Sequence, residues 1–329
     1  MPTMKCDYLS EVWKDDNKVV FCTGGAGTIC SAQVRALVHL GANACIIGRN
    51  VEKTEAVAKD IATARLNAKV LGIGAVDVRS LDSLQAAVDR CVKELGSVDF
   101  VIAGAAGNFL APITQLSANG FKSVIDIDVQ GSYNTIKATL PHLIRSAAKY
   151  KTDGKTTPKT GTGGRIIFIS ATIHYTGLPL QAHVSAAKAG IDALSAAMAI
   201  ELGPRGLTSN VIAPGAITET EGMQRLIRKE DVTAVEKEIP SGRYGRAKEI
   251  ADATVFLFSD AGNYINGDIL VGELNPSRVR NVSIADKFLV DGGGWHRQGV
   301  VSGVGLVYPN FLLADEVVTG VQGTRKAKL

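Results

Sequence analysis

The sequence lacks long hydrophobic runs, aromatic residues are few, and the net charge is small. No apolar stretch reaches the roughly 18 residues that a membrane helix needs, so we expect no membrane span. The formal net charge of +4 is dispersed along 329 residues, which argues against a nucleic-acid-binding surface. The N-terminal residues also lack the apolar core of a secretory signal.

Cysteine is scarce, and histidine shows no metal-ligand spacing. The five cysteines are scattered without a C-x-x-C pair, which predicts free thiols in a reducing compartment. The five histidines are equally dispersed, so we expect no metal site.

Glycine, by contrast, is abundant, at 35 of 329 residues against an average of about 7%. Short, unbroken apolar runs alternate with stretches of helical spacing, which is typical of parallel strands covered on both faces. We therefore predict an α/β fold, a Rossmann-like doubly wound parallel sheet in a single domain (1–329). The predicted strands are residues 18–22, 44–47, 70–73, 100–103, 165–169, 208–212 and a strand starting at 267–270.

Two segments interrupt the alternation of strands and helices. Residues 149–164 are rich in Gly, Thr and Lys, which predicts an exposed polar loop. Residues 271–289 separate the strand start at 267–270 from its apparent end at 290–294, so we interpret them as an insertion. Residues 296–329 form a C-terminal extension beyond the core.

The turn after the first strand indicates a dinucleotide site. Thr23, Gly24, Gly25 and Gly27 lie between a strand and a helix that starts near Thr28 and Ile29. Glycines let the backbone approach a pyrophosphate, and the helix N-terminus offers free N–H groups. A glycine-rich turn alone is weak support, because such turns often join strand to helix.

Residues at the ends of the next strands agree with a cofactor site. Arg49 stands where an NAD-binding fold places an acid against the ribose diol, and a guanidinium can instead bind a 2′-phosphate. We therefore expect NADPH, the alternative being that Arg49 is an ordinary surface arginine. Asp77 and Val78 are placed to bind the adenine, and the small residues around Ala105 and Gly107 leave room for the cofactor.

Together these motifs resemble the short-chain dehydrogenase/reductase family over about residues 15–295. Further matching stretches are Lys188 in Ser185-Ala186-Ala187-Lys188-Ala189-Gly190, the run Asn210-Val211-Ile212-Ala213-Pro214-Gly215, and Val290-Asp291-Gly292-Gly293. The resemblance implies cofactor binding by Thr23, Gly24, Gly25, Gly27, Thr28, Ile29, Arg49, Asp77, Val78, Ala105, Gly107, Lys188, Pro214, Gly215 and Ile217.

The chain departs from the family pattern at the residues of the chemistry. The family's Tyr-x-x-x-Lys motif has Val184 in the tyrosine's place, and Ala171 stands in place of the supporting serine. The helical asparagine corresponds to Asp128. Without the tyrosine, protonation of an alkoxide by the usual group is excluded. Reduction of a conjugated thioester avoids an alkoxide, because the product anion is protonated at carbon.

Several stretches, among them 103–109, 124–128, 183–188 and 213–217, resemble the peroxisomal 2,4-dienoyl-CoA reductase branch in its fungal form. That resemblance implies NADPH-dependent reduction of 2,4-dienoyl-CoA to 3-enoyl-CoA, in the β-oxidation of unsaturated fatty acids. Asp128 and Lys188 would be the catalytic pair. Asn108, Phe109, His183 and Arg225 would contact the substrate, although packing is an alternative role for His183. The family also implies a homo-oligomer.

Two other functions remain open from the residues alone. One is a carbonyl reductase of the same family, for which Tyr175 is the nearby proton-donor candidate. The other is a non-catalytic protein that binds NADPH.

The last three residues, Ala327-Lys328-Leu329, resemble the C-terminal Ser-Lys-Leu peroxisomal address. A receptor reads this type of signal. We therefore expect the peroxisomal import receptor as a partner, and the peroxisomal matrix as the location.

Overall fold

The computed structural model describes residues 18–149, 163–220 and 243–272, together with residues 222, 223, 239 and 241. The predicted C-terminal extension and import signal, Arg225, and most of the 149–164 loop and the 271–289 insertion lie outside the described residues. No helix in these ranges is both long and apolar enough to cross a membrane.

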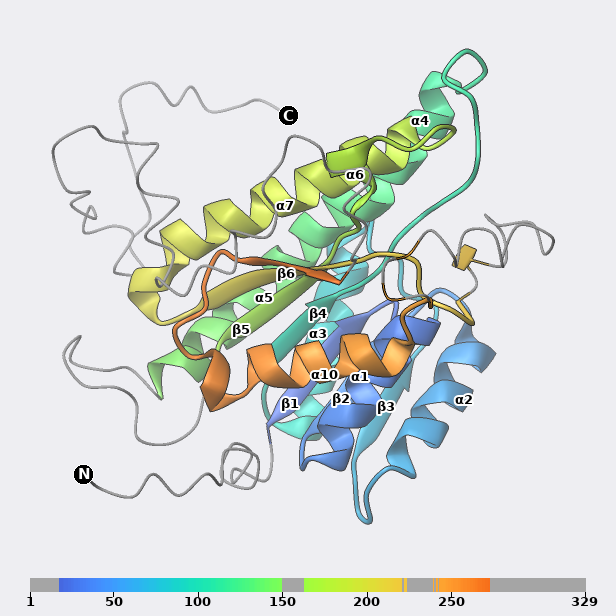
Figure 1. Cartoon of the computed structure of the whole chain (residues 1–329). Helices are drawn as coiled ribbons and strands as arrows, with labels where there is room; N and C mark the ends of the chain where they lie inside the picture. Colours follow the sequence, from blue (N-terminus) through green and yellow to red (C-terminus); the bar gives the residue numbers. More distant parts are fainter. Residues whose placement is uncertain are drawn as a thin grey trace, which may run out of the picture.

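The centre of the molecule is a seven-stranded parallel sheet in the order β3-β2-β1-β4-β5-β6-β7 (Figure 1). The chain order reverses direction between β1 and β4, as in doubly wound folds. The strands are β1 (Val19–Thr23), β2 (Asn43–Ile47), β3 (Val70–Ile73), β4 (Phe100–Ala103), β5 (Arg165–Ile169), β6 (Thr208–Pro214) and β7 (Ile269–Gly272). This confirms the predicted fold class.

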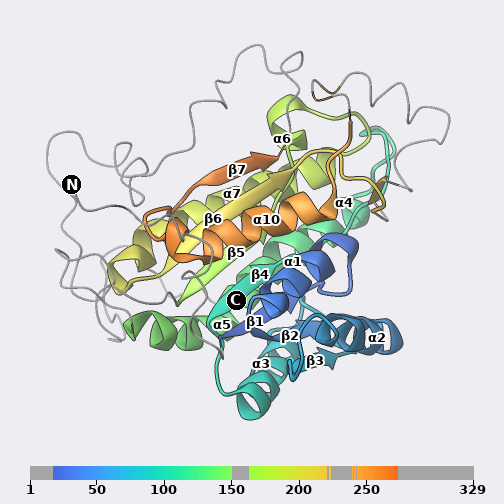
Figure 2. The same ribbon diagram turned by 60° about the horizontal axis from the view of Figure 1, so that its bottom comes forward.

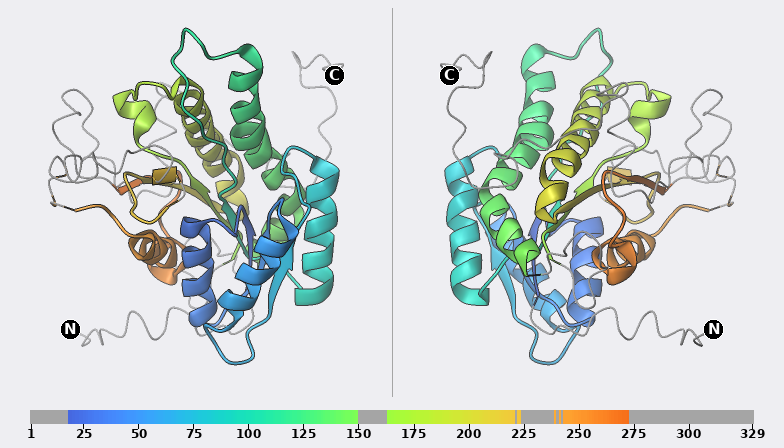
Figure 3. Two further views of the ribbon diagram at one scale, coloured as in Figure 1. Left: turned by 90° about the vertical axis from the view of Figure 1, so that its right-hand side faces the viewer. Right: turned by 90° about the vertical axis from the view of Figure 1, so that its left-hand side faces the viewer.

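Helices cover both faces of the sheet. They are α1 (Thr28–His39), α2 (Val51–Ala62), α3 (Leu81–Leu95), α4 (Ala118–Ile125), α5 (Gly131–Ala148), α6 (Ile173–Thr176), α7 (Ala182–Leu202) and α10 (Ala247–Phe258). A π-helical turn, Asp126–Gln130, joins α4 to α5. Figures 2 and 3 show α1, α2 and α10 on one face, and α3, α5 and α7 on the other.

Successive residues of a strand face opposite sides of the sheet and pack into two separate hydrophobic cores. Val19 and Phe21 of β1 face the core beneath α3, α5 and α7. Val20 and Cys22 face the core beneath α1 and α10. Because both faces are covered, the strands read as unbroken apolar runs in the sequence.

The four cysteines in the described ranges, Cys22, Cys30, Cys45 and Cys91, are free and buried. Burial raises the pKa of Cys22 well above its ordinary value. These thiols therefore pack as small hydrophobic residues.

The buried guanidinium of Arg165 ties the start of β5 to the end of α10. It donates hydrogen bonds to the carbonyl oxygens of Leu257 (2.6 Å) and Ser259 (2.7 Å) and to Asn263 Oδ1. These carbonyls lie where a helix runs out of internal donors. Burial lowers the pKa of Arg165 to about 10, and the group stays charged near neutral pH.

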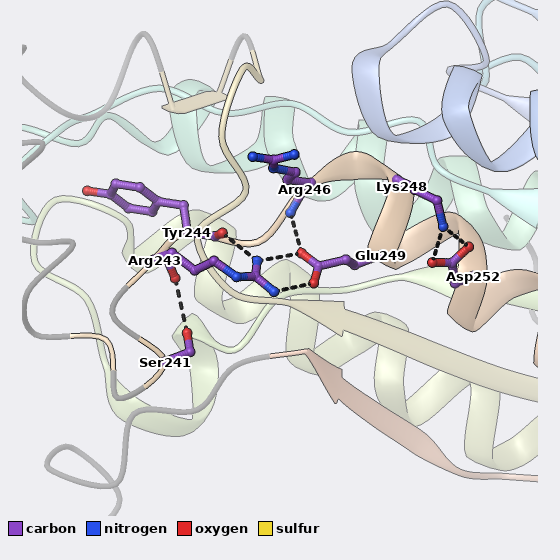
Figure 4. A network of polar contacts seen from close by, with 7 residues as sticks. All are labelled: Ser241, Arg243, Tyr244, Arg246, Lys248, Glu249 and Asp252. Carbon is purple, nitrogen blue, oxygen red and sulfur yellow. Dashed lines mark hydrogen bonds and ion pairs between the residues drawn. The ribbon is translucent and has the colours of Figure 1, made fainter.

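A polar network fixes the start of α10 (Figure 4). The Glu249 carboxylate accepts hydrogen bonds from both terminal nitrogens of Arg243 (2.9 and 2.6 Å) and from the backbone N–H of Arg246 (2.8 Å). Gly245, which lies in the chain between Tyr244 and Arg246 of this network, forms a parallel bridge with Ile217 after β6. The network therefore holds the turn after β6 against α10.

Strand β7 runs through Val271 and Gly272. These are the first two residues of the segment that the sequence analysis assigned to the insertion, so the strand extends further than the apolar run at 267–270 indicated.

Candidate active site

The glycine turn after β1 lies directly against the loop after β4. Gly24 has a φ of +66°, and a Cβ there would come within 2.9 Å of the Ala105 Cα atom. Thr23 Oγ1 accepts hydrogen bonds from the backbone N–H groups of Gly104 (3.1 Å) and Ala105 (3.2 Å). Only glycine fits such a backbone cradle, and α1 begins beside it at Thr28.

A pocket opens at the carboxyl ends of β1, β2, β3 and β4. Its lining is Gly24, Ile47, Gly48, Arg49, Val76, Asp77, Val78, Ala105, Ala106 and Ile127. Five of the predicted cofactor residues, Gly24, Arg49, Asp77, Val78 and Ala105, thus share one pocket, while Gly25, Gly27, Thr28 and Ile29 follow in the adjoining turn and helix. The place and the glycine cradle fit the phosphates and adenosine of a dinucleotide.

Arg79, which the sequence analysis did not name, contacts a residue that lines the pocket. Its guanidinium contacts both oxygens of Asp77, with Nη2 2.6 Å from Oδ2. This arginine holds the pKa of Asp77 below its ordinary value. Its position two residues after Asp77 in the same short turn is the signal that would have found it.

The other predicted cofactor residues lie further along the same edge of the sheet. Pro214 ends β6, and the N–H of Gly215 donates to Gly272 O of β7 (3.3 Å). Ile217 is buried against Gly245. They do not line the pocket.

Asp128 and Lys188 meet in the interior between the π-helical turn and α7. Lys188 Nζ lies 3.0 Å from Asp128 Oδ2 and donates a hydrogen bond to Ile169 O at 3.0 Å. Asp128 is fully buried, and its Oδ1 accepts a hydrogen bond from the N–H of Gly107 at 2.7 Å. The contact between Oδ2 and Lys188 is an ion pair without hydrogen-bond geometry, so Oδ2 has no hydrogen-bond partner within the described residues.

The π-helical turn accounts for where Asp128 points. Its wider hydrogen bonds, such as that from the Gly131 N–H to Asp126 O, rotate the side chains relative to a regular helix. Turns of this kind often occur at functional sites. One member of the pair that the resemblance implied, Asp128, therefore lies in a local departure from α-helical geometry.

The position of the missing tyrosine is filled with hydrocarbon. Val184 is 3% exposed and packs with Val124 and Ala187. The other donor candidate, Tyr175, donates its hydroxyl hydrogen bond to Asp192 Oδ2 at 2.6 Å. Burial and this contact raise the pKa of Tyr175, which disfavours it as an acid.

The predicted substrate residues Asn108, Phe109 and His183 form one group beside the Asp128–Lys188 pair. The rings of Phe109 and His183 lie 4.2 Å apart, centroid to centroid. His183 is fully buried, yet neither ring nitrogen has a hydrogen-bond partner in the described ranges. Asn108 Nδ2 donates to Gln181 Oε1 at 3.4 Å. No group of three or more His, Cys, Asp or Glu side chains suited to a metal occurs in those ranges.

Known proteins resemble this chain in sequence and in fold. A family model described as enoyl-(acyl carrier protein) reductase matches residues 24–273. A peroxisomal 2,4-dienoyl-CoA reductase of Saccharomyces cerevisiae is 46% identical over 86% of this chain and 87% of its own. A protein of the same name from Danio rerio is 39% identical, over 78% and 80%.

Solved structures agree. Levodione reductase superposes with a TM-score of 0.71 at 24% identity, covering 80% of this chain and 98% of its own. A short chain dehydrogenase of Bacillus anthracis superposes with a TM-score of 0.70 at 30% identity, covering 81% and 99%. With the seven-stranded sheet and the glycine cradle, these matches show that the chain belongs to the short-chain dehydrogenase/reductase family, whose fold binds a nicotinamide cofactor.

Proposed function

We propose that this chain is an NADPH-dependent 2,4-dienoyl-CoA reductase that yields 3-enoyl-CoA. The observation that carries the proposal is the buried Asp128–Lys188 pair next to a position 184 occupied by packed valine. The relatives from yeast and zebrafish, named as peroxisomal 2,4-dienoyl-CoA reductases that produce (3E)-enoyl-CoA, support it.

The reaction needs no acid at an oxygen atom. When bound, the nicotinamide supplies a hydride to the distal carbon of the conjugated diene. The displaced electrons then extend to the thioester oxygen as a dienolate. One proton added at the α-carbon completes the product, with its double bond between the third and fourth carbons.

Lys188 and Asp128 can perform the steps left to the protein. The Lys188 ammonium, held by Ile169 O and Asp128, holds the cofactor's ribose hydroxyl and stabilises negative charge nearby. Asp128 is oriented through Oδ1 by Gly107. Its Oδ2, which has no hydrogen bond within the described part of the chain, orders a water that gives its proton to the α-carbon, or gives the proton itself when the carboxyl group is in its protonated form.

Asn108, Phe109 and His183 form the substrate side of the site. An amide donor at Asn108 suits the thioester oxygen. The buried imidazole of His183, which has no hydrogen-bond partner in the described ranges, suits a polar group that arrives with the substrate. Phe109 is 38% exposed and offers apolar surface to the acyl chain. Arg225 remains a predicted contact for the CoA phosphates.

We also place the protein in the peroxisomal matrix, delivered by the import receptor through Ala327-Lys328-Leu329. The yeast and zebrafish relatives are named as peroxisomal, which supports the location. The predicted homo-oligomer is retained on the family resemblance.

Loss of NADPH absorbance with 2,4-decadienoyl-CoA tests the reaction. Turnover is expected in the wild type, and Asp128→Asn should lower kcat by about 10²- to 10⁴-fold, because it removes the proton donor. NADPH should still bind, with its affinity lowered at most by the contribution of the Lys188 contact to the ribose hydroxyl. The matched control is Asp126→Asn, two residues away, whose half-buried carboxylate pairs with Lys122. Failure of a folded, NADPH-binding wild type to turn over the substrate would refute the function.

A further inference from the structure

Three polar side chains outside the Asp128–Lys188 pair meet in the interior beside α7. Asp192 Oδ2 lies 2.8 Å from His174 Nε2 and accepts the hydroxyl hydrogen bond of Tyr175 at 2.6 Å. The His174 and Asp192 side chains are only 8% and 10% exposed. The rings of His174 and Tyr175 are in contact, with centroids 3.8 Å apart and planes tilted by 42°. We call these residues the α6–α7 cluster.

The cluster joins the helix of the catalytic lysine to a separate segment. Asp192 follows Lys188 by four residues on α7, so both project from the same side of that helix. His174 and Tyr175 belong to α6, within residues 170–181, which connect β5 to α7. This segment leaves the sheet after Ile169, whose carbonyl holds Lys188.

The far end of the same segment contacts the predicted substrate residues. The Leu180 carbonyl accepts a hydrogen bond from the N–H of Ala111 at 3.0 Å. Gln181 Oε1 accepts one from Asn108 at 3.4 Å. Residues 170–181 therefore run from the catalytic lysine to residues 108–111, along one side of the site.

The backbone of this segment needs external support. Leu180 has a φ of +67°, a left-handed conformation that costs energy for a residue with a branched side chain. Such a conformation persists only where the surroundings fix it. The four residues of α6 are too few to supply that support by helix hydrogen bonds alone.

All the bonds of the cluster converge on a single oxygen. Asp192 Oδ1 and His174 Nδ1 are buried without hydrogen-bond partners in the described part of the chain. The two contacts at Oδ2 therefore offset the burial of the carboxylate. Loss of either donor leaves a buried acceptor less satisfied, and that is costly.

We propose that His174, Tyr175 and Asp192 are positioning residues that hold residues 170–181 as a wall of the dienoyl-CoA site. The proposal rests on the proposed function. It assigns these residues no contact with the reacting atoms. They act through Leu180 and Gln181 on residues 108–111.

Substrate affinity measured by steady-state kinetics tests this role. Tyr175→Phe removes only the hydroxyl, and His174→Leu removes the ring donor. Each should raise the KM for 2,4-decadienoyl-CoA about five- to tenfold, less than the full effect of one lost buried hydrogen bond to a charged group, because these residues act on the substrate only through residues 108–111. The kcat should stay within about twofold and NADPH binding should be unchanged, because the Asp128–Lys188 pair is intact. His174→Gln, which keeps an N–H donor, should restore most of the affinity.

A matched variant separates positioning from general loss of stability. Thr254→Val removes a fully buried bond, from Gln33 Nε2 to Thr254 Oγ1 at 2.7 Å, between α1 and α10. It should lower Tm to a similar degree with no change in KM. An unchanged KM in both Tyr175→Phe and His174→Leu, despite a lowered Tm, would overturn the proposal.

Amide hydrogen exchange gives a readout that does not depend on turnover. His174→Leu should speed exchange across residues 170–181 but not across β1. Unchanged exchange across residues 170–181 would also overturn the proposal. An inactive wild type would instead refute the reductase function, and the exchange result would still decide whether the cluster holds the segment.

Discussion

Arg49 stands exposed at the rim of the cofactor pocket, at the carboxyl end of β2. Asp77 faces it from beyond β3, and Arg49 helps to lower the pKa of that carboxyl, although Arg79 has the larger effect. Asp77 is thus neutralised mainly by Arg79. This leaves the Arg49 guanidinium available for an anionic group on the cofactor.

Replacing Arg49 tests the choice between the two nicotinamide cofactors. Arg49→Ala should raise the KM for NADPH about ten- to a hundredfold, because charge-assisted hydrogen bonds to a 2′-phosphate are lost. The KM for NADH should change little. Arg35→Ala, which breaks an exposed contact with Asp60, is the control for a general charge effect. Equal losses with both cofactors would contradict the assigned role.

Some residues of the site could be predicted from the sequence, whereas others could not, because only the fold brings them together. The pairing of Asp128 with Lys188 followed from family resemblance, and the structure places them 3.0 Å apart. The backbone groups that orient them, Gly107 N–H and Ile169 O, come from remote segments and carry no side-chain signal. The α6–α7 cluster was missed because only the fold brings Asp192 to His174.

At the scale of elements, strands were easier to predict than irregular helices. The first strand was predicted at 18–22 and runs from Val19 to Thr23, because an unbroken apolar run reports burial on both faces. The π-helical turn Asp126–Gln130 has ordinary helical spacing in the sequence. One of its residues, Asp128, accepts a hydrogen bond from the Gly107 N–H, a tertiary contact that the spacing of residues does not report.

The hydrogen bonds at the start of α10 should make the free energy of unfolding depend on pH in the acid range. Bonds from Arg243 and the Arg246 N–H lower the pKa of Glu249 from 4.5 to about 2. Because the folded-state pKa is lowered, this stabilisation is present above about pH 4.5 and is lost as pH falls toward 2. Urea unfolding of the wild type and Glu249→Gln should therefore give free energies of unfolding that converge over that range.

Asp252→Asn is the matched control for Glu249→Gln. Asp252 pairs with Lys248 on the same helix, exposed to solvent, but accepts no bond from the helix N-terminus. If both variants show the same pH dependence, the cap at Glu249 is not its source.

At the scale of the whole molecule, the described fold accounts for the proposed chemistry, and the last three residues are proposed to supply only an address. Deletion of Ala327-Lys328-Leu329 should therefore leave kcat and KM unchanged while a fluorescent fusion of the full chain moves from peroxisomes to the cytosol. A change of Leu329 to Lys is the single-residue equivalent. Continued import of the truncated chain would contradict the signal.

The packing of Val184 limits which side chains position 184 can hold. Its side chain fills a closed cluster with Val124 and Ala187, and Ile173 packs against them. A phenol ring restored at 184 would overfill that cluster, so neighbouring positions would have to shrink first. We therefore expect that Val184→Tyr alone does not give this chain the chemistry of a Tyr-x-x-x-Lys reductase.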